Sequence, residues 1–265
     1  MSASATVRVR GDRLVWYRDA ADEPGHWERH WREHPPVNIP NLTLPAWYRG
    51  LMFRWLPRDG LICEAGCGHG VVKRALRDKG FEVEGVDFAE ETVAANRRVD
   101  PSGRYRVADV RGLPYGDGEL AGYISLGVIE HFEDDGERGR IVSEAWRCLR
   151  RGGVAVISTP YYSPLRRLAG GFNADGSGGA GGAGAFYQFA FSMSELVGEV
   201  EAGGLRVVHR DAYGVRKGFK DTVRRPGVTR AIFGASEDSR RWADHPVRPV
   251  RLLAGHMAIV VAVKP

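Results

Sequence analysis

The sequence predicts an α/β fold built on a parallel sheet, and one stretch carries the prediction. An apolar run at 61–63 ends in Glu64 and is followed by glycines on alternate positions, Gly66, Gly68 and Gly70. A helical pattern over 71–79 ends at a glycine, and a second apolar run ends at Asp87. Strand, glycine turn, helix and strand form a βαβ unit, whose two strands run parallel.

The turn suits a cofactor that carries a nucleoside. Glycines let the backbone approach a ligand closely, and the start of a helix offers N–H groups to it. Asp87, at the tip of the second strand, is placed to accept hydrogen bonds from ribose hydroxyls. A dinucleotide fingerprint would need a third glycine where Val71 stands, and Glu64 would repel a pyrophosphate. A nucleoside with an amino-acid tail fits better, because its ammonium group suits Glu64.

Several motifs resemble the class I S-adenosylmethionine (SAM)-dependent methyltransferases. The first is the run 64–70, EAGCGHG, which resembles motif I of that family, and Asp87-Phe88 resembles its acidic residue after the second strand. The likeness continues through 108–114, 125–131 and 149–153 and covers about 60–265. It implies a Rossmann-like seven-stranded sheet of order 3-2-1-4-5-7-6 with strand 7 antiparallel. It also implies an N-terminal helical lid (1–58) and a core (59–265) with insertions after strands 5 and 6, at 161–191 and 211–251.

The remaining elements follow in order. Residues 7–17 are either a short strand or an irregular lead-in, and helices are expected from Asp22 through Trp31 and over 45–56. After Asp87 we expect a helix over 90–98 and strands at 104–108 and 119–126, the latter apolar as a central parallel strand should be. Helical segments at 128–132 and 141–149, a fifth strand at 154–158 and a helix capped by Ser192 come next. Strands at 205–210 and 256–263 complete the sheet.

The resemblance assigns roles to residues at one rim of the sheet. Asp87 would bind the ribose, Asp109 and Val110 the adenine, and Phe88 would cover the adenine or ribose face. Leu126 and Gly127 would pass beside the sulfonium end. Arg49, just before the first strand, is either a clamp for the methionine carboxylate or a solvated helix residue. The full predicted cofactor set is Glu64, Gly66, Cys67, Gly68, Gly70, Asp87, Phe88, Asp109, Val110, Leu126, Gly127 and Arg49.

Methyl transfer needs a positioned acceptor and, for an amine or hydroxyl, removal of a proton. His131, at the rim of the fourth strand, is the first candidate base; Tyr161 and His69 are weaker ones, and His131 could instead order the helix start. Acceptor contacts are expected from aromatic residues of the lid and of the 161–191 insertion: Trp16, Tyr17, Trp27, Trp31, Tyr162 and Tyr187. Trp47 and Trp55 are expected in the core.

No metal is expected. Relatives in the ubiquinone pathway carry E-x-x-E-H here and bind a divalent ion, but this chain has Gly127 in place of the first glutamate. The insertion after strand 5 is rich in Gly, Ala and Ser between 170 and 185, and we expect a mobile loop there. Whether it is a substrate flap or a plain insertion stays open.

Composition narrows the function further. The 265 residues contain no signal peptide or membrane-spanning run, and the three cysteines have no C-x-x-C spacing, which predicts a cytoplasmic protein. A net charge of +5 reflects abundant arginine spread along the chain rather than a nucleic-acid site. We therefore expect a methyltransferase acting on oxygen or nitrogen of a small molecule, as a monomer or homodimer. An RNA methyltransferase and a non-catalytic SAM-binding protein are the alternatives.

Overall fold

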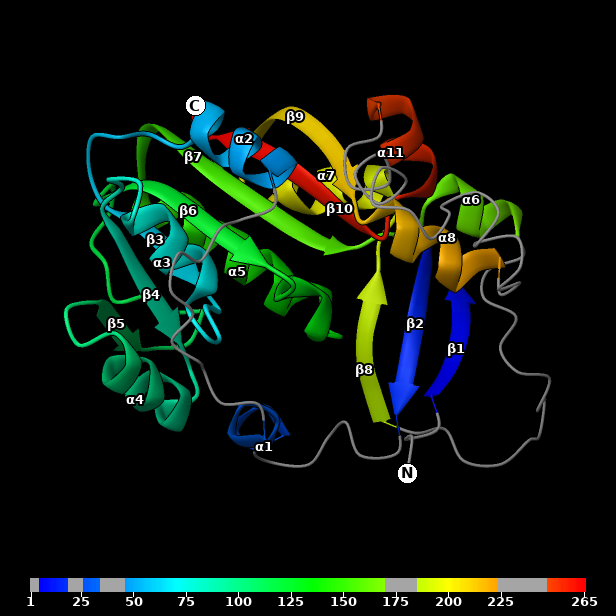
Figure 1. Ribbon diagram of the computed structural model, residues 1–265. Helices are drawn as coiled ribbons and strands as arrows, with labels where there is room; N and C mark the ends of the chain where they lie inside the picture. Colours follow the sequence, from blue (N-terminus) through cyan, green and yellow to red (C-terminus); the bar gives the residue numbers. More distant parts are fainter. Residues whose placement is uncertain (1–4, 19–25, 34–45, 170–184, 224–246) are drawn as a thin grey trace.

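The computed structural model describes the chain apart from residues 1–4, 19–25, 34–45, 170–184 and 224–246. Its described strands form two sheets, one of seven strands and one of three. Figure 1 shows the large sheet on one side, flanked by helices, and the small sheet beside it. Strand β8 belongs to the small sheet, but in sequence it lies between β7 and β9 of the large sheet. The chain therefore passes from the large sheet to the small one and back.

The large sheet has the order β5-β4-β3-β6-β7-β10-β9, which confirms the predicted 3-2-1-4-5-7-6 arrangement. Neighbouring strands from β5 to β7 pair in parallel, and β10 pairs antiparallel with both β7 and β9, as expected for strand 7. The strands are β3 (Ile62–Ala65), β4 (Val83–Asp87), β5 (Arg104–Val107), β6 (Leu120–Leu126), β7 (Leu149–Pro160), β9 (Arg206–Tyr213) and β10 (Met257–Val263).

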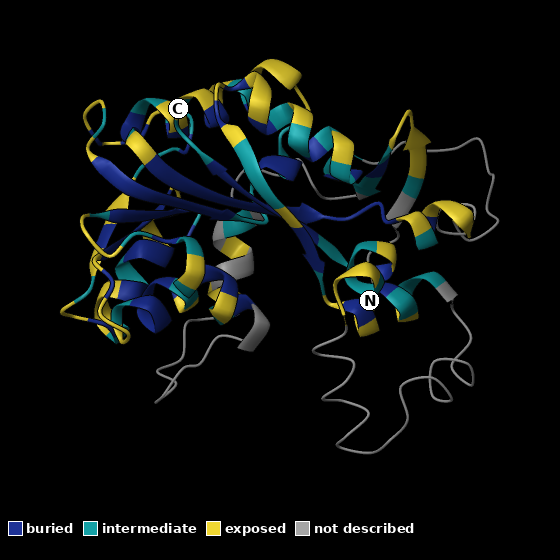
Figure 2. Ribbon diagram, turned by 90° about the horizontal axis from the view of Figure 1, so that it is seen from above, coloured by how far each residue is buried: buried dark blue, intermediate teal, exposed yellow. Residues whose placement is uncertain are grey.

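Helices cover both faces of this sheet, and its central strands are buried between them (Figure 2). On one face α2 (Ala46–Trp55) and α3 (Val71–Arg77) bury side chains such as Met52 and Leu76 against β3 and β10. On the other face α5 (Asp135–Cys148) and α7 (Met193–Ala202) pack Ile141 and Leu196 into the larger core. Helix α4 (Glu90–Val99) lies against β4 and β5. The predicted α/β architecture is therefore confirmed.

Two boundaries differ from the sequence prediction. The expected helix at 128–132 is one turn of 3₁₀ helix, η1 (Ile129–His131), and α5 begins earlier than expected because Asp134 caps it by accepting from the Glu137 N–H. The fifth strand is longer than predicted at both ends: β7 pairs with β10 as far as Pro160, and at its start Leu149 pairs with Leu120 of β6.

The first 58 residues are only partly the helical lid that was expected. Helices α1 (His26–Glu33) and α2 are present, but residues 5–18 form a hairpin of β1 (Ala5–Arg10) and β2 (Arg13–Arg18). Strand β2 also pairs antiparallel with β8 (Ala185–Ala190), which returns from the insertion after β7. The predicted lid is thus corrected: its described residues form two helices and two strands, and the strands belong to a three-stranded sheet shared with the insertion.

An arginine and an aromatic cluster hold the small sheet to the core. Arg13 donates to Glu195 of α7 at 2.9 Å and lies over the rings of Phe189 and Phe191. Phe189 and Phe191 are buried among residues of both α5 and α7. The small sheet is therefore anchored by packing and by charge to the helices of one face.

The second insertion carries short helices at its two described ends. These are α8 (Val215–Val223) and α11 (Arg248–Ala254), which pack with α6 (Pro164–Leu168) of the first insertion around Val215. The buried Arg166 donates to the carbonyl of Tyr161 and to Nδ1 of His256. The Gly-rich centre of the first insertion, where a mobile loop was expected, lies outside the described residues.

Ser192 caps α7 as predicted: it accepts from the Glu195 N–H, and Glu195 accepts from the Ser192 N–H in return. Substituting Ser192→Ala should lower the free energy of unfolding by about 1 kcal/mol, because the Glu195 N–H loses its acceptor, the Ser192 hydroxyl. Urea unfolding measures the change. Ser143→Ala, on an exposed position of α5, is the control and should change stability little; equal effects in both variants would contradict the capping role.

Candidate active site

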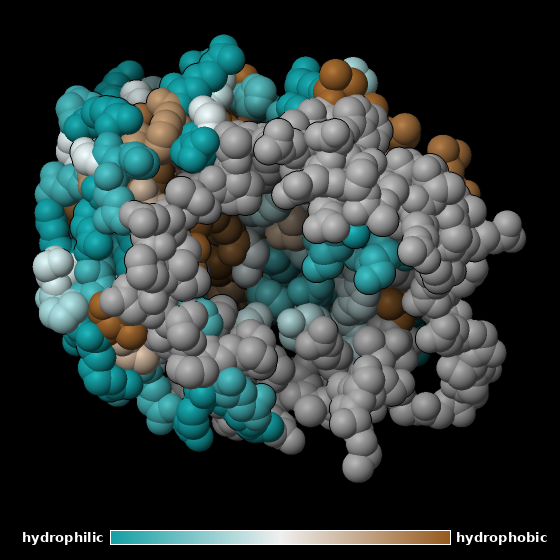
Figure 3. Space-filling model, in the orientation of Figure 1, coloured by the Kyte–Doolittle hydropathy of each residue, from teal (hydrophilic) through white to brown (hydrophobic). Residues whose placement is uncertain are grey.

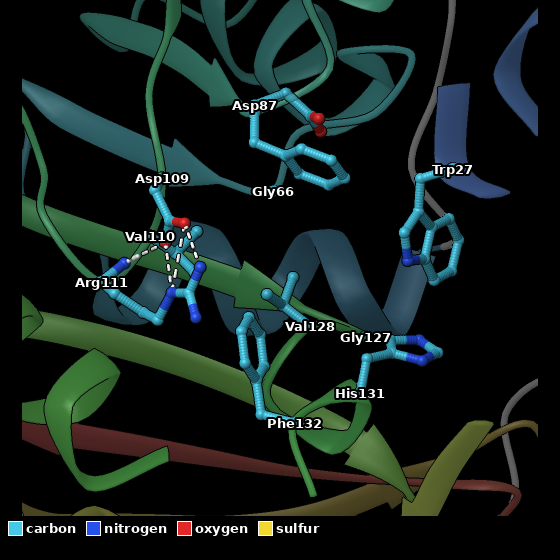
Figure 4. A pocket seen from close by; sticks show the side chains of 11 residues that line it. Trp27, Gly66, Asp87, Asp109, Val110, Arg111, Gly127, Val128, His131 and Phe132 are labelled. Carbon is cyan, nitrogen blue, oxygen red and sulfur yellow. Dashed lines mark hydrogen bonds and ion pairs between the residues drawn. The ribbon is translucent and has the colours of Figure 1, made fainter. Parts of the chain in front are cut away.

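A pocket of about 280 Å³ opens at the carboxyl ends of the central parallel strands. This is where open α/β sheets bind ligands. Figure 4 shows Asp109 and Arg111 at one end of it, Asp87 and Gly66 along one wall, and His131 with Trp27 at the other end. In the space-filling view of Figure 3 this face is hollowed, with hydrophobic and hydrophilic side chains inside the hollow. The lining residues are Trp27, Gly66, Asp87, Phe88, Asp109, Val110, Arg111, Gly127, Val128, His131 and Phe132.

The glycine turn after β3 is shaped by its neighbours. Gly66 has φ 72°, and a Cβ there would lie 2.5 Å from a methyl group of Val128, so no other residue fits without displacement. The N–H groups of Gly66 and Cys67 both donate to the carbonyl of Val86, at 2.8 and 2.9 Å. The turn therefore lies tightly against the end of β4.

Asp87 braces the same turn. Its Oδ2 accepts from the Gly68 N–H at 2.8 Å and its Oδ1 from the Ala89 N–H at 3.0 Å. Burial raises the pKa of Asp87, although these backbone donors oppose the shift. Each carboxylate oxygen has a second lone pair, so Asp87 can accept ligand hydroxyls while it holds the turn.

Glu64 is buried near the end of β3, and its side chain reaches the first turn of α3. Its Oε2 accepts from the backbone N–H of Lys73 at 2.7 Å. Burial raises its pKa to about 8, against the hydrogen bond from Lys73 and the positive charges of Lys73 and Arg74, which lower it. The site without ligand thus holds a proton on Glu64 near neutral pH, and a cationic group nearby would favour its ionised form.

Asp109 forms an ion pair that the sequence analysis did not include. Arg111 approaches both carboxylate oxygens, with Nη2 2.6 Å from Oδ2, and also pairs with Glu137 (Figure 4). Arg111 lowers the pKa of Asp109, which stays ionised. In the sequence, the ion pair is indicated only by the arginine that stands two residues after the acid. Such pairs are common on protein surfaces, so the spacing does not by itself indicate a pocket.

His131 is held by residues from two other segments. Its Nδ1 lies 2.9 Å from the carbonyl oxygen of Tyr187 in β8. Because a carbonyl can only accept, Nδ1 carries a proton and the lone pair of the neutral ring is on Nε2. The Trp27 ring meets the His131 ring edge-on at 4.7 Å, and the Tyr187 ring does so at 5.2 Å. The structure therefore brings together three of the predicted acceptor-site residues.

Of the predicted cofactor set, half lines this pocket: Gly66, Asp87, Phe88, Asp109, Val110 and Gly127. Glu64, Gly68, Gly70 and Leu126 belong to the strand ends and the turn beside it. The Cys67 side chain points elsewhere, since it is buried against Val93 and Tyr105 between α4 and β5. Arg49 lies on α2, is half-buried and is not among the residues that line the pocket.

The two insertion tyrosines are not in the pocket. Tyr161 is buried and its hydroxyl donates to the Leu252 carbonyl at 3.0 Å, so it stabilises the contact with α11. Tyr162 is buried with Leu14 and Ala190 beneath the small sheet. Neither position supports the catalytic or acceptor role that the sequence suggested.

The remaining predicted aromatic residues lie on the lid. Trp16 and Tyr17 are on β2, where Tyr17 packs against the large core and Arg8 lies over its ring. They are partly buried in the small sheet rather than in the pocket lining. Trp31 falls within α1, but its side chain lies outside the described residues.

The residues present fit a nucleoside cofactor with an amino-acid tail. Acceptors for hydroxyl and amine groups stand at Asp87 and Asp109, and a buried acid, Glu64, stands by the glycine turn. Val110 and Phe132 give the pocket apolar walls between them. Within the described residues no group of three or more His, Cys, Asp or Glu side chains is arranged to hold a metal ion.

Residues 63–157 match the sequence model of a methyltransferase domain. A probable SAM-dependent methyltransferase of Mycolicibacterium smegmatis is 37% identical over 113 residues, which cover 43% of this chain and 42% of that protein. A malonyl-[acyl-carrier protein] O-methyltransferase of Enterobacter lignolyticus is 29% identical over 38% of this chain and 39% of its own length. The chain thus matches about two fifths of the length of these curated relatives.

Solved structures share the fold. A SAM-dependent methyltransferase from Methanosarcina mazei aligns with a TM-score of 0.55 at 16% identity, covering 81% of this chain and 96% of that one. A geranyl diphosphate C-methyltransferase from Streptomyces coelicolor, solved with Mg²⁺, geranyl diphosphate and S-adenosylhomocysteine, aligns with a TM-score of 0.52 at 17% identity over 93% and 85% of the two chains.

The raised pKa of Glu64 predicts a pH-dependent stability. The folded protein holds the proton up to about pH 8, whereas an unfolded glutamate loses it near 4.5. The stabilisation is therefore complete below pH 4.5 and is lost as the pH rises toward 8. Urea unfolding at pH 5, 6.5 and 8 measures the free energy of unfolding of the wild type and of Glu64→Gln. The wild-type value minus the variant value should decrease as the pH rises. Glu82→Gln, on a half-exposed position, is the control; a difference independent of pH would refute the assignment.

The strand order, the glycine turn braced by Asp87, and the pocket at the rim agree with the sequence match over 63–157. Residues 63–157 are therefore similar to a methyltransferase domain, and the curated relatives that match there are named as SAM-dependent methyltransferases.

Proposed function

We propose that the protein transfers a methyl group from SAM to an oxygen or nitrogen atom of a small molecule. The observation that supports this most is the composition of one pocket. Its one end has the acids and glycine turn of a nucleoside site, and its other end has a histidine between aromatic rings. A single pocket thus offers both a cofactor site and an acceptor site.

The residues that would hold the cofactor follow the order in which they line the pocket. Asp109 and Val110 would bind the adenine, Asp87 the ribose hydroxyls, and the turn at Gly66 with Glu64 the amino-acid end. When bound, SAM supplies a methyl group made electrophilic by the sulfonium charge. The protein's part is to position the acceptor in line with that group and to keep water away.

Arg111 changes the expected role of Asp109. Since the guanidinium engages both oxygens of that carboxylate, an adenine amine would share Asp109 with Arg111 rather than have it alone. The ion pair would keep Asp109 ionised and fixed in orientation, which favours a well-defined adenine position.

The acceptor end is walled by Trp27, Phe132 and the histidine itself, which supports a planar or partly apolar acceptor. The Tyr187 carbonyl fixes the His131 tautomer, so Nε2 is the atom that could accept a hydrogen bond or a proton from the acceptor. His131 would therefore orient the acceptor or take its proton.

The relatives support methylation in general rather than one acceptor. One is named for O-methylation of malonyl-[acyl-carrier protein], and a structural neighbour for C-methylation of geranyl diphosphate. The first agrees with an oxygen acceptor. No helix among the described residues has the length and apolar character needed to cross a membrane; we propose a small-molecule enzyme of the cytoplasm, acting as a monomer or homodimer.

Cofactor binding tests the ribose assignment. Asp87→Ala should weaken the binding of S-adenosylhomocysteine by roughly 100-fold, because two hydroxyl contacts are lost and the glycine turn loses its brace. Isothermal titration calorimetry measures the affinity. Asp117→Ala, at an aspartate 83% exposed, is the control; affinity unchanged by Asp87→Ala would remove Asp87 from the site.

Turnover tests the acceptor end. Incubation with isotope-labelled SAM and a panel of small hydroxyl and amine compounds, read by mass spectrometry, should reveal a methylated product. His131→Ala should then lower kcat by roughly 100-fold while the affinity for S-adenosylhomocysteine stays the same. Unchanged turnover would exclude His131 from acceptor binding. Tight cofactor binding without any product would favour the non-catalytic alternative.

A further inference from the structure

A second pocket, of about 370 Å³, opens between α2, β9 and α11, which lie along the upper edge of the molecule in Figure 1. No described residue lines both this second pocket and the candidate active site, so the proposed methyl transfer gives it no role. The side chains that matter for its chemistry are those of Leu51, Arg54, Trp55, His209, Asp211, Arg248 and Arg251.

The second pocket has an excess of positive charge. Its described lining contains three arginines, Arg54 on α2 and Arg248 and Arg251 on α11, but one acid, Asp211 on β9. That acid is already engaged, because Asp211 is buried and accepts from Nε of Arg251 at 2.9 Å and from its Nη2 at 2.5 Å. Within the part of the chain that the structure describes, Arg54 and Arg248 have no carboxylate partner.

A pocket beside the hairpin of β1 and β2 has the opposite balance of charge. It is lined by two arginines and four acids: Arg10, Arg13, Glu133, Asp134, Asp135 and Glu195. Arg13 pairs there with Glu195 at 2.9 Å. The excess of arginine in the second pocket is therefore a property of that site and does not follow simply from a chain rich in arginine.

Neighbouring groups orient the two arginines that lack an acid. Nη2 of Arg248 donates to the carbonyl of Arg210 at 2.9 Å. The guanidinium of Arg54 lies over the Trp55 ring, 5.5 Å from its centre. Side chains that are already oriented lose less conformational entropy when they bind an anion. Leu51 and Trp55 give the same pocket an apolar surface.

The charges of the arginines converge on His209. Its ring lies 5.7 Å from the Trp55 ring, and its side chain is partly exposed. Burial lowers the pKa of His209; Asp211 raises it, and the positive charges of all three arginines of the pocket lower it. One side chain of the pocket thus experiences all three charges, and an anion placed beside it would be stabilised by them.

We propose that the second pocket binds the phosphate group of a small molecule, with Arg54 and Arg248 donating hydrogen bonds to the phosphate oxygens. A phosphate ester carries about two negative charges near neutral pH, which match the two arginines without an acid. Guanidinium groups suit phosphate, because their planar donors fit its oxygens in pairs. Leu51 and Trp55 contact the apolar part of the ligand.

The shape of the site favours a small molecule over a nucleic acid. A hollow with apolar and charged side chains together is typical of small-molecule sites, whereas nucleic acids bind along an extended basic track. The ligand is distinct from SAM and from the methyl acceptor, and the inference does not depend on the proposed function.

Inorganic phosphate is the probe, and NMR of the His209 ring reports its binding; His209→Asn identifies the signal. At pH 6.5 and constant ionic strength in chloride, phosphate should move the signal saturably toward that of the protonated ring, because the anion offsets the arginine charges. Arg54→Gln and Arg248→Gln should each weaken phosphate binding roughly tenfold, because each loses a charge-assisted hydrogen bond.

Arg206→Gln is the matched control. It removes an exposed arginine of β9 that is not among the residues lining the second pocket, and it should leave the affinity for phosphate within about twofold. Equal weakening by all three variants would mean that phosphate responds only to the net charge of this surface, which would overturn the proposal. A His209 signal that phosphate does not move saturably would overturn it too.

Two further ligands separate the remaining interpretations. If a short single-stranded RNA moves the His209 signal and phosphate does not, the surface binds nucleic acid and the proposal is wrong. Saturating S-adenosylhomocysteine should leave the affinity for phosphate unchanged, and competition between the two would contradict a separate site. A protein that binds phosphate as expected but not S-adenosylhomocysteine would refute the proposed function and leave this inference supported.

Discussion

The hydrogen bond from the Gly68 N–H to the Asp87 carboxylate is the contact on which the site depends. It joins the turn after β3 to the tip of β4, and the Asn96 side-chain amide of α4 donates to the Gly68 carbonyl at 2.6 Å from the other side. Two strands and a helix thus fix one glycine turn. Asp87 both lines the pocket and holds the glycine turn in place. A substitution of Asp87 would therefore change the conformation of the turn as well as the polar groups in the pocket.

Burial has the same electrostatic effect on several acids at this rim. Glu64, Asp87 and Glu130 all have pKa values raised by burial, while Arg111 lowers the pKa of Asp109 and keeps it ionised. A positively charged ligand would favour the ionised forms and offset their desolvation. The acids with raised pKa values and the ion-paired Asp109 thus occupy different parts of the site. This arrangement suits a ligand with its positive charge at one end, such as a sulfonium amino acid attached to a neutral base.

Much of the fold could be predicted because its signals are local and ordered along the chain. The βαβ unit, the acid after each strand and the helix cap at Ser192 all depend on neighbours in sequence. The pairing of β2 with β8 could not, since nothing in residues 13–18 indicates a partner near 185–190. For the same reason Tyr161 and Tyr162 were placed at the rim, although tertiary packing turns them inward, toward Leu252 and Leu14.

The contact between β2 and β8 also bears on how the chain assembles during synthesis. Leu14 pairs with Ala190, so the hairpin of β1 and β2 leaves the ribosome long before the strand that completes its sheet. A hairpin of two strands alone is marginal in water, and pairing between distant segments forms slowly. The strand that holds the His131 ring is therefore added late, after β3, β4 and β6 have been made. A nascent chain would acquire the glycine turn and Asp87 before the strand that contacts His131.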